Sequence, residues 1–91
     1  MSYEYKNVME ILVEEELKNL IPSMEGCTCE QCLTDIAALA LNRLPVKYVS
    51  THKGELFSRT STLRLQNQAD IIVALTASAK IVHENPRHDE A

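Results

Sequence analysis

The sequence contains no tryptophan, a single phenylalanine and no long apolar run, although 45% of its 91 residues are hydrophobic. No stretch approaches the ~20 consecutive apolar residues that a membrane-spanning helix needs. The first 20 residues are rich in glutamate and lack the basic and then apolar pattern of a secretory signal. Charged and apolar residues are interleaved, which is typical of a globular chain. We therefore expect one cytoplasmic domain over residues 1–91.

Cysteine is scarce, and all three cysteines lie within six residues, at positions 27, 29 and 32. A disulfide between such near neighbours would close a very small loop and remove little chain entropy. The odd number also leaves one thiol over. Reduced thiols gathered around a metal ion suit a cytoplasmic protein better.

The sequence also has only two glycines and three prolines. Because they are so few, their positions indicate where regular structure stops. Three helices are expected, over residues 7–20, 30–44 and 62–84, ended by Pro22, Pro45 and Pro86. Asn7 is the expected N-cap of the first. Residues 46–50 are expected to be extended, 51–60 a turn or short helix, and 86–91 a flexible tail. The fold class predicted is all-α, a small helical domain of three main helices with a short extended or turn connector.

The third expected helix contains five consecutive apolar residues, from Ile71 to Leu75. Consecutive apolar residues point to all sides of a helix, so no single packing partner covers them. A domain of three short helices has little room to bury them all. We therefore predict a homodimer in which a second chain supplies the missing surface.

The cysteine cluster predicts a structural zinc site held by Cys27, Cys29 and Cys32, since thiolates at short spacing suit tetrahedral zinc. Cys29 and Cys32 stand three residues apart at the start of the second helix, where the partial positive charge of the helix terminus favours thiolate. Cys27 reaches the same point from a loop in which Gly26 permits a tight path. The alternative is three ordinary reduced cysteines at a helix start.

Three cysteines leave the fourth zinc ligand to be assigned. The candidates are His88, His83, His52, Glu30 and water. We predict His88, because the polar segment beyond Pro86 could fold back onto the site. A catalytic cysteine is disfavoured, since a helical chain of this size can hardly enclose the pocket that a Cys–His enzyme needs.

The middle of the chain is basic although the whole protein carries a net charge of −4. Five cations and one carboxylate lie between residues 43 and 64; the cations are Arg43, Lys47, Lys53, Arg59 and Arg64. An acidic protein with one cationic patch suits a compact phosphorylated ligand better than a nucleic-acid strand. Tyr48 and the arginines could stack on bases, and hydroxyls over residues 58–62 could donate to phosphate at the start of the third helix. The alternative is a solvated face, or cations paired with the acidic first helix of the same or a second chain.

The segment CTCEQCLTDIAALALNRLPVKYVST resembles the late competence protein family ComFB. The family hallmark resembles C-x-C-x-x-C-x-x-D followed by A-L-N-x-L-P-x-x-Y-V. The matching residues are Cys27, Cys29, Cys32, Asp35, Ala40, Leu41, Asn42, Leu44, Pro45, Tyr48 and Val49, and the similarity extends to Asn85, Pro86 and Arg87. Asp35 and Asn42 are seven residues apart and are therefore expected on one face of the second helix. They could be ligand groups, but polar residues at the helix surface or in an internal hydrogen bond are commoner.

This resemblance implies a bacterial helical homodimer with cysteine-bound zinc, named for a competence operon. Family members have been connected with binding cyclic dinucleotides such as cyclic di-GMP, as receptors without catalytic activity. If relatives use a fourth cysteine near the C-terminus, this chain lacks it. Two functions are thus expected. One is a cyclic-dinucleotide receptor that acts through protein partners and binds the ligand with Arg43, Lys47, Tyr48, Arg59 and Arg64. The other is a zinc-stabilised structural or protein-interaction adaptor.

Overall fold

The structure, a computed structural model, describes residues 4–51 and 55–86, with side chains in the second range from Arg59 onward. Strand β1 (Tyr5–Asn7) leads into helix α1 (Val8–Leu20) and the 3₁₀ turn η1 (Ile21–Ser23). Helix α2 (Glu30–Arg43), strand β2 (Tyr48–Ser50) and helix α3 (Glu55–Glu84) follow. The three helices make the domain predominantly helical, as predicted. The predicted tail lies, from residue 87 on, outside the described residues.

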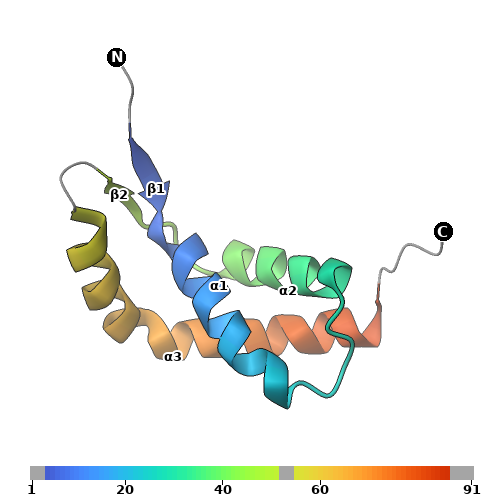
Figure 1. The fold of residues 1–91 in the computed structure, drawn as a ribbon. Coiled ribbons are helices and arrows are strands. Elements are labelled where there is room, and N and C mark those ends of the chain that lie inside the picture. The colour runs from blue at the N-terminus through green and yellow to red at the C-terminus, as the bar shows by residue number, and fades with distance from the viewer. Residues whose placement is uncertain (1–3, 52–54, 87–91) are drawn as a thin grey trace.

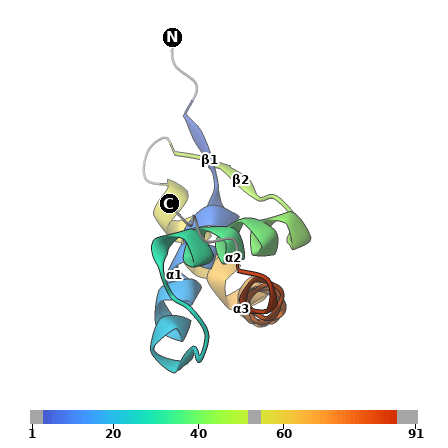
Figure 2. The same cartoon turned by 90° about the vertical axis from the view of Figure 1, so that its right-hand side faces the viewer.

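Helix α3 is the longest element, and both other helices pack on it. Helix α2 crosses its C-terminal half, and α1 packs against both α2 and α3 (Figure 1). Figure 2 looks nearly along the C-terminal half of α3 and shows α2 passing over it. The core between the helices is formed mainly by Val8, Met9, Leu12, Val13, Leu17, Cys32, Ile36, Ala40, Val49, Ile71, Ala74, Leu75 and Val82. The helical spacing of apolar residues in the sequence thus corresponds to the face that each helix buries.

The two strands form a small antiparallel sheet at one end of the molecule, beside the first turns of α3 (Figure 1). Tyr5 pairs with Ser50, Lys6 with Val49 and Asn7 with Tyr48. The predicted extended segment is confirmed at Tyr48–Ser50, and Tyr5–Asn7 is the partner strand that the sequence did not indicate. The sheet joins the N-terminal segment to the middle of the chain.

The first two predicted helices are confirmed within one residue at their described ends. Asn7 caps α1, because its side-chain oxygen accepts the backbone N–H of Met9 at 3.2 Å. Helix α1 ends at Leu20, and Pro22 lies in the turn η1 that follows. Helix α2 ends at Arg43, two residues before Pro45.

The predicted start of the third helix, residue 62, is wrong: α3 begins at Glu55. Residues 55–60 of the segment expected as a turn or short helix therefore belong to the long helix. The stretch 58–62 lies inside α3 and not at its N-terminus, and Thr60 is buried. The predicted phosphate contacts of residues 60–62 at a helix N-terminus are therefore wrong, because these residues lie beyond the first turn of α3.

The run from Ile71 to Leu75 is only partly covered within one chain. Ile71, Ala74 and Leu75 are buried in the core, whereas Val73 is 68% exposed.

The helices that the structure describes include none with the length and hydrophobicity required of a membrane span.

Candidate metal centre

The sulfur atoms of Cys27, Cys29 and Cys32 all lie within 4.8 Å of one another. All three cysteines are reduced. Cys32 is fully buried, Cys27 is half-buried and Cys29 is exposed, so the cluster lies where the core meets the surface. Such an arrangement of three thiols is suited to bind one metal ion, and zinc prefers sulfur ligands in this number and proximity.

Local backbone geometry explains why the thiols converge. Cys29 is the N-cap of α2, and its sulfur accepts the backbone N–H of Cys32 at 3.5 Å. The sulfur of Cys27 accepts the backbone N–H of Cys29 at 3.4 Å. These bonds direct two backbone N–H groups at the sulfur atoms of Cys27 and Cys29 and so restrict where those atoms lie. The short spacing and the helix start therefore position the predicted cluster.

Without a metal, the surroundings of Cys32 disfavour its charged thiolate form. Burial, together with hydrogen bonds and charge repulsion from Cys27 and Cys29, raises the pKa of the Cys32 thiol from 9.0 to about 12. A divalent cation among the sulfurs would reverse this effect, because a metal ion stabilises coordinated thiolate. The donor set thus fits zinc.

The predicted fourth ligand, His88, lies outside the described residues, as does His52. Glu30, in the first turn of α2, is exposed. His83, on the last turn of α3, lies against the cysteine loop, and its Nε2 is 2.9 Å from the carbonyl oxygen of Cys27. No local sequence pattern indicated this contact, because 56 residues separate the two positions.

The five predicted ligand-binding residues come from α2, the connector, β2 and the first half of α3, whereas the further cation Lys53 lies outside the described residues. Arg43 lies in the last turn of α2, and Arg59 is exposed on α3. Tyr48 is 61% exposed and packs edge-on against Tyr5, with ring centroids 5.8 Å apart. The described contacts do not place all these residues around one point.

Two of the predicted ligand residues are engaged elsewhere in the protein. Arg64 forms an ion pair with Glu15 of α1. The backbone of Lys47 donates to Asn7 Oδ1 at 2.9 Å and accepts from the amide of Val8 at 2.7 Å, while its half-buried side chain remains a candidate.

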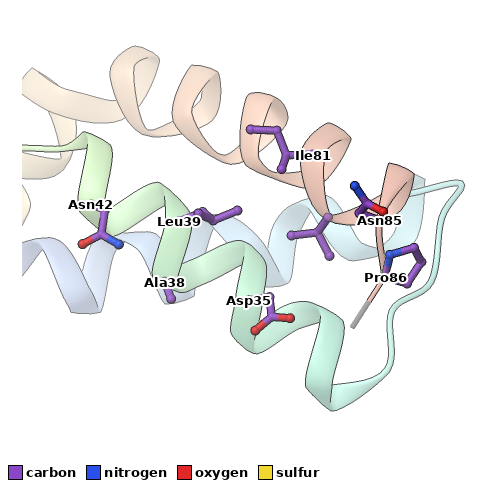
Figure 3. Close-up of a pocket in the computed structure, with 8 residues that line it drawn as sticks. Asp35, Ala38, Leu39, Asn42, Ile81, Asn85 and Pro86 are labelled. Atoms are coloured by element: carbon purple, nitrogen blue, oxygen red, sulfur yellow. The ribbon is translucent and has the colours of Figure 1, made fainter. Parts of the chain in front are cut away.

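A groove of about 630 Å³ lies between α2 and the end of α3. Figure 3 shows Asp35, Leu39 and Asn42 on α2, with Ile81 on α3 and Asn85 directly after the end of α3. Asp35 and Asn42 thus share one face of α2, as their spacing predicted. The Oδ2 atom of Asp35 is buried and has no hydrogen-bond partner among the residues described. Ile81, by contrast, is a large apolar side chain that is 42% exposed. The groove therefore combines apolar surface with an unsatisfied acceptor.

Comparisons with known proteins agree with the hallmark in the sequence. The family model described as Late competence development protein ComFB matches residues 6–86. Competence protein ComFB of Bacillus subtilis (strain 168) is 31% identical over 81 residues, which are 88% of this chain and 83% of that protein. A solved structure of the late competence protein ComFB from Bacillus subtilis superimposes with a TM-score of 0.76 at 30% identity and covers 96% of both chains.

Proposed function

Since the chain belongs to the ComFB family of late competence proteins, we propose that it is a non-enzymatic regulatory protein whose clustered cysteines hold a structural zinc ion. The observation that carries this proposal is the mutual proximity of three sulfur atoms, within 4.8 Å, around the start of α2. Zinc bound there would connect the loop before α2 to the helix itself. For a domain of 91 residues, whose core is small, such a link adds substantially to stability.

Zinc content tests the metal proposal directly. Protein purified without chelators should contain about one zinc per chain, and Cys29→Ser should lose the metal and melt at a lower temperature. Thr28→Ser is a matched control, because Thr28 is exposed and lies between two of the cysteines. Less than about a tenth of an equivalent in the wild type, with unchanged melting in Cys29→Ser, would contradict the proposal. The predicted role of His88 is tested in the same way, by comparing the zinc affinity of His88→Ala.

The regulatory signal that we propose is a cyclic dinucleotide, with cyclic di-GMP as the first candidate. The supporting observation is an exposed aromatic ring, Tyr48, within the segment of the chain that carries the excess positive charge. A ring of this kind stacks on a base, and nearby cations neutralise phosphate. The proposed ligand residues are Arg43, Lys47, Tyr48, Arg59 and Arg64. Binding would alter contacts with a protein partner, so no catalytic group is required.

Titration calorimetry distinguishes this ligand from related molecules. Wild-type protein should respond to cyclic di-GMP more strongly than to cyclic di-AMP or to a linear dinucleotide. Replacing the ring in Tyr48→Ala should weaken binding about tenfold, which corresponds to the loss of one base stack. The lack of any heat with either cyclic dinucleotide at high micromolar concentration would remove the receptor proposal.

The second candidate function is a protein-interaction adaptor, favoured by the groove between α2 and α3. A buried carboxylate oxygen without a partner is costly, so the groove would be stabilised by a donor from a bound protein. We propose that the donor is an arginine next to an apolar side chain, which would match Asp35 and the exposed Ile81. Peptides that carry arginine beside leucine should shift the amide resonances of Ile81 and Asn85. The same peptides with citrulline in place of arginine, or the variant Asp35→Ala, should show no such shift.

We also propose that the protein is a homodimer that associates through α3. Leu65 is 82% exposed and Val73 is 68% exposed. Leu65, Ala69, Ile72 and Thr76 are spaced by four, three and four residues, which places them on one face of the helix. Ala69 and Thr76 are exposed and Ile72 is half-buried, so this face is available to a second copy of the same helix.

A further inference from the structure

The loop that carries Cys27 is held less directly than the other two cysteines. Cys29 and Cys32 belong to the cap and first turn of α2, whose hydrogen bonds fix their positions. Cys27 stands before the helix, in the part of the chain without regular structure between η1 and α2. A hollow of about 310 Å³ lies between part of this loop and α3, and Gly26 and His83 are among the residues that line it. Placing the Cys27 sulfur therefore depends on a small number of contacts.

His83 supplies one of these contacts from the last turn of α3. Its Nε2 lies 2.9 Å from the carbonyl oxygen of Cys27. A carbonyl oxygen can only accept a hydrogen bond, so the imidazole must donate through Nε2–H. The bond connects the backbone of the loop cysteine to a helix that belongs to the core.

Gly26 provides independent evidence that this contact is close. A Cβ atom added at Gly26 would lie 2.3 Å from both Cγ and Nδ1 of the His83 ring and 2.5 Å from Cδ2. These distances are far below van der Waals contact, so only glycine allows the ring to lie this near the loop. The ring thus packs against Gly26 while its Nε2 donates to the carbonyl oxygen of Cys27.

We infer that His83 is a positioning residue for the metal centre, which holds Cys27 in place for zinc by bonding its carbonyl and packing on Gly26. This inference rests on the proposed zinc site. It predicts that α3 contributes to metal affinity although it supplies none of the three sulfur ligands. Outer residues that orient ligands in this way typically affect metal affinity about 10–100-fold.

Two substitutions separate the hydrogen bond from the shape of the ring. His83→Phe keeps an aromatic ring but removes the donor, and should raise the zinc dissociation constant at least about tenfold in competition with a chromophoric chelator. His83→Gln restores an N–H donor and should remain close to the wild type. Gln66→Ala, an exposed neutral position about five turns earlier on α3, should have no effect. Equal affinities in wild type and His83→Phe would overturn the inference.

Cobalt(II) substitution distinguishes positioning from direct ligation. If His83 only positions Cys27, the d–d absorption bands of the cobalt protein should be the same in wild type and His83→Phe. A shift of these bands would mean that the imidazole is itself a ligand, and would overturn the positioning role. Wild-type protein that binds no zinc would remove both the metal proposal and this inference. If the protein binds zinc and its dissociation constant is the same in wild type and His83→Phe, the metal proposal stands and only the inference about His83 is contradicted.

A double-mutant cycle provides a second test that does not depend on the His83→Phe variant folding well. Gly26→Ala should weaken zinc binding in the wild-type background, because the new methyl group displaces the ring. In the His83→Ala background the same substitution should have little effect, since the ring is gone. Additive effects of the two changes would contradict the coupling that the inference requires.

Discussion

The guanidinium group of Arg64 on α3 bonds the carboxylate of Glu15 on α1, with Arg64 Nε 3.1 Å from Glu15 Oε1. The two side chains are 39% and 48% exposed, so solvent screens the pair and its contribution to stability is about 0–1 kcal/mol. The pair bears more on the proposed ligand binding, because it partly neutralises Arg64, one of the four cations that we propose bind phosphate. Arg59, on the same helix, is exposed.

The two arginines should therefore contribute unequally to binding of a cyclic dinucleotide. Arg59→Ala should weaken binding at least about tenfold, a loss of ~1.4 kcal/mol. Arg64→Ala should have a smaller effect, since Arg64 must first leave Glu15. Calorimetry on both variants measures the difference, with Lys18→Ala as an exposed cationic control on α1. An equal or larger loss in Arg64→Ala would show that the ion pair does not restrain this side chain.

Dimerisation through α3 can be separated from folding by choosing residues of different burial. Val73→Glu places a charge on a side chain that is 68% exposed in one chain, so it should yield a folded monomer. Leu75→Glu places the charge in the core and should unfold the protein. Sedimentation and circular dichroism measure the two outcomes. Wild-type protein that sediments as a monomer at tens of micromolar would contradict the dimer.

Local sequence features predicted the first two helices well, because each has a cap and an apolar face in one continuous segment. The start of α3 was missed because Gly54 and the serines and threonines that follow indicate a loop on local grounds. The helix nevertheless includes the serines and threonines from residue 58 on, and Thr60 is buried, so tertiary packing overrides local preference here. Strand β1 was missed for a related reason. It is three residues long and is stabilised by pairing with a segment about 40 positions away.

In the candidate metal site, too, the residues placed by local structure were predicted, whereas the contact that depends on tertiary packing was not. The three cysteines were found from spacing, since Cys29 and Cys32 are placed by a single helix turn. His83 could be listed only as one of several histidines. Its contact with Cys27 joins positions 56 residues apart, and this depends on how α3 packs beside the loop. Gly26 was interpreted as permitting a tight turn, whereas the structure shows that it admits the His83 ring.

Asn7 should be one of the most sensitive polar positions for stability. Its Oδ1 accepts the amide of Met9 at the start of α1 and that of Lys47 beside β2. Asn7→Ala removes both bonds and should destabilise the protein by about 2 kcal/mol, measured by urea denaturation. Asn7→Asp keeps an acceptor and should retain most of the stability. Asn19→Ala, an exposed position near the end of α1, is the control. Equal stability of Asn7→Ala and Asn19→Ala would mean that the double contact contributes little.

The stability of the metal-free protein should decrease at alkaline pH because of Cys32. Its thiol has a pKa of about 12 in the folded chain against 9.0 for an ordinary cysteine, so the folded state favours the protonated form. The resulting stabilisation is fully present below pH 9 and is lost as the pH rises toward 12, since the unfolded chain then releases the proton more readily. The midpoint of urea denaturation in the presence of a chelator should therefore be lower at pH 10.5 than at pH 8.

Tyrosines and lysines titrate in the same range, so the contribution of Cys32 must be isolated by comparison with Cys32→Ala. The variant should show a weaker decrease in midpoint between pH 8 and pH 10.5 than the wild type. Zinc-loaded wild-type protein should behave differently, because metal binding displaces the thiol protons and its affinity falls as the pH is lowered. Its stability should consequently decrease on the acid side, together with zinc release measured by a chromophoric chelator. If the denaturation midpoint falls equally between pH 8 and pH 10.5 in metal-free wild type and Cys32→Ala, burial of this thiol does not control the pH dependence.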